Sequence, residues 1–318
     1  MHKIKAFFKL IRWPNLLMIM VAQSLLNYMV IGRVLNLIHV DLPLYHFQFM
    51  LLMMSTVFMA AWGYAYNDVE DEKVDAINKE EKRIIGKTFS KKTGLSIAYS
   101  FLALSLIPAF YLSIQLEMIQ LVFLHILIGV GLWYYSKQLK KTVLLGNIAI
   151  SLFTAFSIFI VWLYHLVVLK MDSTMMVNSQ KLIPFINQLV LYYSAFAFVI
   201  SLIREITKDI EDKTGDAQYQ MKTFVVEFGL SKTKILLYSL GILMLLMLGS
   251  AIYFSYYYQW TQLSIYLGVA IGIPLLYFLK TLKNSQSTED FSNLSILAKV
   301  IMLAGILSMQ LFYISYGL

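Results

Sequence analysis

Residues 143–166, VLLGNIAISLFTAFSIFIVWLYHL, form an apolar stretch that contains no Asp, Glu, Lys or Arg. A helix of this length can cross the roughly 30 Å of hydrocarbon in a bilayer. Eight further apolar stretches of comparable length occur in the chain, near 16–36, 47–66, 94–114, 118–136, 185–203, 234–255, 262–280 and 294–315. The sequence therefore predicts an all-α, polytopic membrane protein with nine transmembrane helices in a bundle.

The composition of the chain agrees with a lipid environment. Of its 318 residues 59% are hydrophobic and only 14% are charged, which excludes a cytosolic enzyme and a nucleic-acid-binding module. The absence of cysteine excludes disulfides, thiolate metal sites and thiol nucleophiles. The N-terminal MHKIKAFFKLIRWPN is basic, but no small-residue cleavage site follows it, so we expect a first span and not a removed signal peptide.

The basic residues predict how the chain is oriented. With nine spans, 22 of the 26 Lys and Arg fall on the side of the N-terminus, whereas Arg33, Lys170 and Lys181 fall on the other side and Lys299 lies in the last span. Basic loops remain in the cytoplasm. We therefore expect a cell (inner) membrane protein with a cytoplasmic N-terminus and an external C-terminus, and the net charge of +8 needs no nucleic-acid partner.

Two long polar segments, 67–93 and 204–233, lie on the predicted cytoplasmic side and hold 13 of the 18 acidic residues. Each contains aspartates at positions i, i+3 and i+7, which share one face of a helix. We call them the first triad, Asp68, Asp71 and Asp75, and the second triad, Asp209, Asp212 and Asp216. They follow the second and sixth spans, so we expect them to form two Asp-rich caps on the same side of the membrane. This arrangement suits one domain, 1–318, with a possible four-helix pseudo-repeat, about 1–140 and 141–280, and a ninth helix.

Six carboxylates beside a bilayer imply a bound cation or a water-filled opening, because a carboxylate at the bilayer centre costs about 2.5–3.5 kcal/mol even on insertion scales. Oxygen ligands without imidazole or thiolate favour Mg²⁺, which binds through a few carboxylates together with phosphate oxygens. The triads therefore indicate a magnesium diphosphate as substrate. The alternative for each triad is a solvated helix end that carries i,i+4 ion pairs.

The polar segments resemble signatures of the UbiA superfamily of intramembrane prenyltransferases. Residues 67–75, NDVEDEKVD, match its first signature, N-D-x-x-D-x-x-x-D, and 209–216 match its second. Residues 135–140 followed by Gly146 and Asn147 resemble the segment after the fourth helix of the family, and Arg83 resembles the arginine after the first signature, although 78–84 lacks the two prolines usual there. Within the superfamily, 204–216 is most similar to the geranylgeranylglyceryl phosphate geranylgeranyltransferases.

The resemblance implies a Mg²⁺-dependent transfer of a prenyl group from its diphosphate to a lipid acceptor taken from the bilayer. The implied metal ligands are Asn67, Asp68, Asp71, Asp75, Asp209, Asp212 and Asp216. Four of these are also expected to be catalytic, namely Asp71, Asp75, Asp212 and Asp216. The expected diphosphate-binding residues are Asn15, Arg83, Tyr135, Ser136, Lys140, Arg204 and Lys208. Each of these positions also has an explanation without a ligand. The basic residues could reflect the positive-inside bias alone, Tyr135 could anchor the helix at the membrane interface, and Asn15 could cap a helix.

Three other functions remain open at this point. The acceptor could be an aromatic quinone precursor of the 4-hydroxybenzoate, dihydroxynaphthoate or homogentisate type and not a prenylglyceryl phosphate. A cation-coupled transporter is a different class, but transporters place their carboxylates near the bilayer midplane, whereas here the acids lie at span ends. The CDP-alcohol phosphotransferases also use paired acidic motifs, but their D-G-x-x-A-R core is missing.

Overall fold

The structure is a computed structural model that describes residues 2–78 and 83–316 of the chain. Its regular elements are helices, apart from one isolated bridge between Ile85 and Phe89, so the all-α prediction is confirmed for these residues. The elements are α1 His2–Leu10, α2 Trp13–Leu25, η1 Leu26–Ile31, α3 Gly32–Asn36, α4 His46–Glu70, α5 Glu72–Asn78, α6 Lys91–Gln115, α7 Gln120–Lys137, η2 Leu139–Lys141, α8 Leu145–Met171, α9 Ser173–Ser179, α10 Ile183–Gln218, α11 Phe224–Tyr257, α12 Thr261–Tyr266, η3 Leu267–Gly272, α13 Ile273–Asn284 and α14 Thr288–Ser315.

Eight helical stretches within the described residues are long and apolar enough to cross a membrane, which makes the chain a multi-pass membrane protein. They coincide with eight of the nine predicted spans. The predicted span 118–136 coincides with α7, which has only 18 residues and is not among the eight. The polar ends of α7, Gln120 and Lys137, lower its mean hydropathy. The ninth span is therefore not confirmed.

The described helices divide into two compact units that do not follow chain order. Unit 1 comprises Met1–Met20, Leu44–Ala149 and Thr214–Thr223, and unit 2 comprises Val21–Pro43, Ile150–Lys213 and Phe224–Leu318. Three continuous helices, α2, α8 and α10, contribute residues to both units. The predicted single domain with a four-helix pseudo-repeat stays a prediction.

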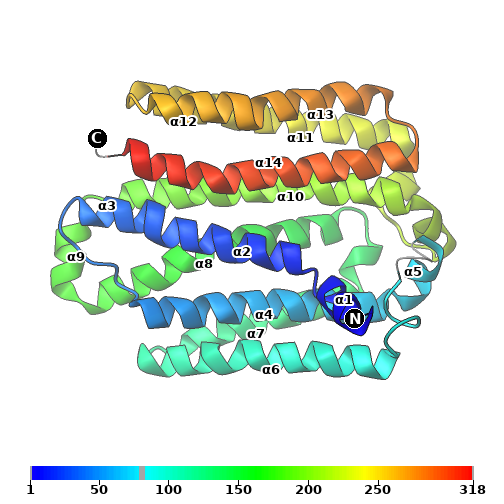
Figure 1. The fold of residues 1–318 in the computed structure, drawn as a ribbon, viewed down its shortest axis with the longest axis horizontal. Coiled ribbons are helices and arrows are strands. Elements are labelled where there is room, and N and C mark those ends of the chain that lie inside the picture. Colours follow the sequence, from blue (N-terminus) through cyan, green and yellow to red (C-terminus); the bar gives the residue numbers. More distant parts are fainter. Residues whose placement is uncertain (1, 79–82, 317–318) are drawn as a thin grey trace. The chain divides into compact units, whose positions relative to one another are not determined.

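In unit 1, α4, α6 and α7 lie side by side (Figure 1). One face of α4, formed by Met59, Trp62, Tyr66 and Val69, is buried against this core. Its spacing of three to four residues is that of one helical stripe, and such burial contributes about 1.5–3 kcal/mol per large side chain. This packing fixes the end of α4, where the first triad begins.

In unit 2, α11 and α14 lie beside the segment formed by α12, η3 and α13 (Figure 1). Helix α14 begins with a capping box in which Ser287 and Asp290 bind each other's backbone N–H groups. Gly229, with a positive φ of 78°, interrupts α11 near its start. The apolar length of these helices accounts for their prediction as spans.

Candidate functional site

The first triad lies at the junction between α4 and α5. Asp68 belongs to the last turn of α4, whereas Asp71 ends that helix with φ −87° and ψ 5° and precedes α5. The backbone hydrogen bonds continue through the break, because Asp71 N–H donates to Asn67 O at 2.9 Å and Asp75 N–H donates to Asp71 O at 2.8 Å. The expectation that this triad lies on one uninterrupted helix was therefore wrong. Asn and Asp side chains compete for backbone hydrogen bonds, which makes them less favourable inside a helix than in a turn.

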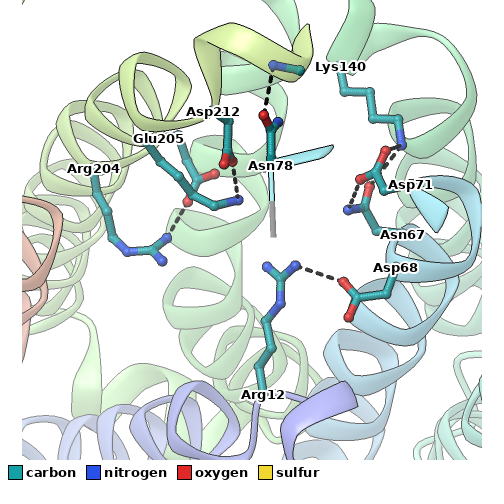
Figure 2. Close-up of polar contacts among 11 residues, drawn as sticks. Arg12, Asn67, Asp68, Asp71, Asn78, Lys140, Arg204, Glu205 and Asp212 are labelled. Atoms are coloured by element: carbon teal, nitrogen blue, oxygen red, sulfur yellow. Dashed lines mark hydrogen bonds and ion pairs between the residues drawn. The ribbon is translucent and has the colours of Figure 1, made fainter. Parts of the chain in front are cut away.

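Two cationic side chains bind the first triad. Lys140 Nζ forms an ion pair with Asp71 Oδ1, and Asn67 Nδ2 donates to Asp71 Oδ2 at 2.7 Å (Figure 2). Arg12 Nη2 donates to Asp68 Oδ1 at 3.0 Å, and its guanidinium carbon lies 4.8 Å from the centre of the Tyr64 ring. The Lys140 side chain is only 9% exposed. The two charges of this partly buried pair depend on each other, since removal of one partner leaves the other charge uncompensated.

A third ion pair lies next to the triad. Lys137 Nζ donates to Glu70 Oε1 at 2.8 Å. This hydrogen bond to a carboxylate raises the pKa of Lys137, so the ammonium form persists to higher pH than usual. Together with Lys140, it places two positive charges at the C-terminal end of α4, where the helix dipole favours cations.

The backbone at Gly146 lies close to the backbone of Leu139 and Lys140, and this contact fixes the position of Lys140. A Cβ atom added to Gly146 would lie 2.8 Å from Lys140 Cα and 2.9 Å from Leu139 O. Both atoms belong to the backbone of the short segment between α7 and α8, so neither can rotate away. Glycine at 146 therefore allows this segment to fold back and to bring Lys140 to Asp71.

We expect the substitution Gly146→Ala to destabilise this segment by about 1–3 kcal/mol, because the added methyl group must displace backbone atoms. It should also move Lys140 away from Asp71. Thermal unfolding of the purified protein measures the first effect. The control is Gly249→Ala in α11, where an added Cβ would meet no atom within 4 Å. Equal unfolding temperatures of the two variants would contradict the close backbone contact at Gly146.

The second triad lies on the uninterrupted helix α10, as its spacing predicted. Lys208 Nζ lies 3.6 Å from Asp212 Oδ2, an i,i+4 ion pair, and Arg204 pairs with its neighbour Glu205 (Figure 2). Local i,i+4 pairing is thus present, as the alternative of a solvated helix end also predicted. Asp216 is 6% exposed and therefore buried, unlike an ordinary solvated aspartate.

The last turns of α10 are held in unit 1. Gly215 N–H donates to Asn78 Oδ1 at 2.8 Å, and a Cβ atom at 215 would lie 2.3 Å from the same oxygen (Figure 2). Lys222 N–H donates to Lys141 O at 3.0 Å, which is a second hydrogen bond between the end of α10, with the residues after it, and the rest of unit 1. Asp216 therefore belongs to the same compact unit as the whole first triad.

The remaining predicted site residues have other surroundings. Asn15 Nδ2 donates to Tyr64 Oη at 3.4 Å and caps no helix through a described side-chain bond. Ser136 is buried and Tyr135 is partly buried at the end of α7. The Nε atoms of Arg83 and Arg204 are buried without a hydrogen-bond partner among the described residues. Two guanidinium groups thus retain donor capacity, which an anionic ligand could use.

Arg12 and Asn78 were not predicted as site residues. Arg12 lies 56 positions before Asp68, and Asn78 lies 137 positions before Gly215, so no local periodicity relates the partners. The only sequence signals are a basic residue just before the first span and an asparagine three positions after Asp75. Neither signal indicates which residue Arg12 or Asn78 contacts.

The donor set fits Mg²⁺ by its chemistry. Within the described residues, no three His, Cys, Asp or Glu side chains lie close enough together to bind a metal ion. The carboxylates of Asp71 and Asp68 are held by cationic side chains instead. All candidate ligands are carboxylate or amide oxygens, which is the set that Mg²⁺ prefers. The metal site stays a prediction.

Comparisons with known proteins give concordant matches. Residues 36–304 match the UbiA prenyltransferase family. A digeranylgeranylglyceryl phosphate synthase of Saccharolobus solfataricus is 36% identical over 177 residues, 55% of each chain, so this alignment spans about half of that relative. The enzyme of the same name from Korarchaeum cryptofilum is 30% identical over 259 residues, 78% of this chain and 80% of the relative.

Solved structures show the same fold. A digeranylgeranylglyceryl phosphate synthase in membranes superimposes with a TM-score of 0.58 at 20% identity, covering 98% of this chain and 99% of that one. A UbiA homolog from Archaeoglobus fulgidus bound to GPP and Mg²⁺ superimposes with a TM-score of 0.56 at 13% identity, covering 96% and 99%. At these identities the likeness concerns the fold alone.

Proposed function

Because the chain belongs to the UbiA prenyltransferase family, we propose that it transfers a prenyl group from a magnesium-bound prenyl diphosphate to a lipid acceptor within the membrane. We further propose that the donor is geranylgeranyl diphosphate and the acceptor a prenylglyceryl phosphate. The observation that carries the proposal is the gathering of the first triad, Lys140 and Asp216 in one compact unit. The names of the relatives support the choice of acceptor.

In the proposed reaction the allylic C–O bond breaks and its electron pair leaves with the diphosphate. Bound Mg²⁺ would act as a Lewis acid on the diphosphate oxygens. Asn67 and the aspartates of both triads would hold the metal ion. Lys140 and Arg12, now paired with Asp71 and Asp68, would turn toward the phosphate oxygens by charge-assisted hydrogen bonds. An acceptor hydroxyl would then capture the allylic cation and lose its proton.

Several predicted residues have a place in this scheme. Arg83 and Arg204 would use their unpartnered guanidinium donors to bind diphosphate, with Lys208, Ser136 and Asn15 as further polar contacts. Tyr135 would present its ring face to the cation, an attraction of about 0.5–2 kcal/mol. The apolar helices would exclude water from the cation and protect it from hydrolysis.

The deciding experiment measures prenyl transfer in membranes that contain the protein. With radiolabelled geranylgeranyl diphosphate, Mg²⁺ and geranylgeranylglyceryl phosphate we expect a labelled ether lipid, and removal of Mg²⁺ with EDTA should abolish it. Parallel reactions with 4-hydroxybenzoate, dihydroxynaphthoate and homogentisate test the aromatic acceptors. Absence of product with every acceptor, together with solute uptake by proteoliposomes, would favour a transporter.

We also propose that α7 is a ninth span and that the N-terminus is cytoplasmic. At 1.5 Å per residue, its 18 residues extend about 27 Å, close to the hydrocarbon thickness. It packs beside α4 and α6, both of which qualify as spans. Nine spans place the two long polar segments on the side that carries most of the basic residues.

The absence of cysteine allows a clean test of this orientation. We expect Tyr256→Cys, at a side chain 73% exposed, to react with a membrane-impermeant maleimide in intact cells. Lys73→Cys, at an exposed position in α5, should react only after the membrane is permeabilised. Labelling of both positions in intact cells, or of Lys73→Cys alone, would show that the topology is wrong.

A further inference from the structure

A cavity of about 140 Å³ lies wholly within unit 2, among α10, α11, the segment α12–η3 and α14. Its wall is mainly aliphatic and aromatic, and includes Phe196, Leu248 and Ile271. The few polar groups are partly paired with each other, as when Tyr193 and Ser308 share a hydrogen bond at 3.3 Å. Apolar cavities exclude water, so this one suits a hydrocarbon ligand.

The cavity is separate from the second triad. Phe196 precedes Asp209 by 13 residues on the continuous helix α10, which corresponds to about 20 Å along the helix axis. Both residues belong to unit 2. A ligand in this cavity therefore lies far from the nearest acid of the second triad, and the proposed reaction assigns it no function.

Aromatic residues surround the cavity near Phe185, at the opposite end of α10 from the second triad. The ring of Tyr316 stacks on Phe185 and on Phe312, with ring centres 5.5 and 5.1 Å apart, and Trp260 packs edge-on against Phe312 at 5.3 Å. Phe185, Trp260 and Phe312 line the cavity. Next to them, Tyr256, Tyr257 and Tyr258 are exposed, with fractions of 73%, 68% and 49%. Tyr and Trp gather at headgroup level, so this aromatic cluster marks the membrane–water interface.

A guanidinium group adjoins the aromatic cluster. Arg33 Nε donates to Tyr316 O at 2.7 Å, and its Cζ lies 5.1 Å from the centre of the Tyr313 ring. Its position is therefore fixed by the same residue that stacks on the lining side chains. A guanidinium presents parallel N–H donors that match the oxygens of a phosphate.

We propose that this cavity binds one hydrocarbon chain of an anionic bilayer lipid and that Arg33 binds the phosphate of its headgroup. The apolar wall accounts for the chain, and the interfacial aromatic cluster places the headgroup at the correct level. The positive charge of Arg33 selects an anionic over a neutral headgroup. The site would be occupied by a lipid of the surrounding membrane and would not depend on the proposed transferase activity.

The chain-binding part is tested with the full-length protein by native mass spectrometry in detergent, with dioleoyl phosphatidylglycerol as the probe. Ala251 lines the cavity from α11, so Ala251→Phe fills it, and we expect the lipid-bound fraction to fall about tenfold. The matched control is Leu246→Phe, which adds a ring on the same helix at a side chain 68% exposed. Undiminished binding by Ala251→Phe, or equal losses in both variants, would overturn the proposal.

The headgroup part is tested by competition between dioleoyl phosphatidylglycerol and dioleoyl phosphatidylcholine. We expect the unmodified protein to prefer the anionic lipid about fivefold, and Arg33→Gln to lose this preference while it still binds a lipid. Lys170→Gln, at another basic residue on the predicted outer side, should retain it. Equal affinity for the two lipids in the unmodified protein, or a preference that survives in Arg33→Gln, would refute the role of Arg33.

Discussion

The variants Asp71→Asn and Asp212→Asn are each expected to lower the rate of prenyl transfer at least about 10²–10³-fold, because each removes a charged group from the proposed stabilisation of the departing diphosphate. The amide keeps the size of the side chain but not its charge. For Asp71 the loss also removes the carboxylate with which Lys140 forms its ion pair. Initial rates with saturating donor and Mg²⁺ give the comparison.

Neighbouring acids provide matched controls for these two variants. Glu72→Gln and Glu211→Gln each remove one negative charge beside a triad without altering it. Both should retain rates within a fewfold of the unmodified protein. Size-exclusion chromatography and thermal unfolding in detergent show whether each variant is folded. A near-normal rate in either Asp variant would remove the metal assignment.

The substitution Gly215→Ala is expected to have the second largest effect. Its Cβ atom would lie 2.3 Å from Asn78 Oδ1, well inside any permitted contact, so the Asn78 side chain, or one of the helices α10 and α5, must shift. The shift also breaks the bond from Gly215 N–H to Asn78. Since Asp216 is the next residue, and a displacement of about 1 Å can cost roughly 10²-fold in rate, we expect a loss of activity of that order. Overpacking should add about 1–3 kcal/mol of destabilisation.

A double substitution separates the steric effect from other causes. Asn78→Ala removes the clashing oxygen and one hydrogen bond, which alone costs about 0.5–1.5 kcal/mol. Gly215→Ala combined with Asn78→Ala should therefore be less destabilised than the sum of the single variants, as contacting residues couple. Simple additivity would show that residues 78 and 215 do not touch in the folded protein.

The membrane fold was predictable because its signal is local. Each span is a continuous apolar stretch, so eight of them could be read from neighbouring residues without knowledge of their partners. The full length of α10 was harder to predict, since 204–218 is polar and only the spacing of the second triad indicated a helix there; the structure shows that this segment continues the helix of the sixth span. The break at Asp71 was missed because the spacing of the triad is compatible with an unbroken helix.

The ligand types at the candidate site were also predictable, but their partners were not. Asp71 and Lys140 were both named from the sequence, and the structure brings them together. Arg12 and Asn78 were not named, because their contacts depend on how distant segments pack. Hydrogen bonds and ion pairs between such segments carry no periodic signal along the chain.

The interruption at Asp71 gives the two triads different mechanical properties. Asp209, Asp212 and Asp216 project from one continuous helix, so their spacing is set by the helical repeat and resists change. Asp68 and Asp75 belong to separate helices joined at Asp71, and small rotations of that residue alter the separation of their carboxylates. In the proposed metal site, accommodation of divalent ions of different radius would thus fall to the first triad, and residues that stiffen its junction would narrow the range of ion radii that the site could bind.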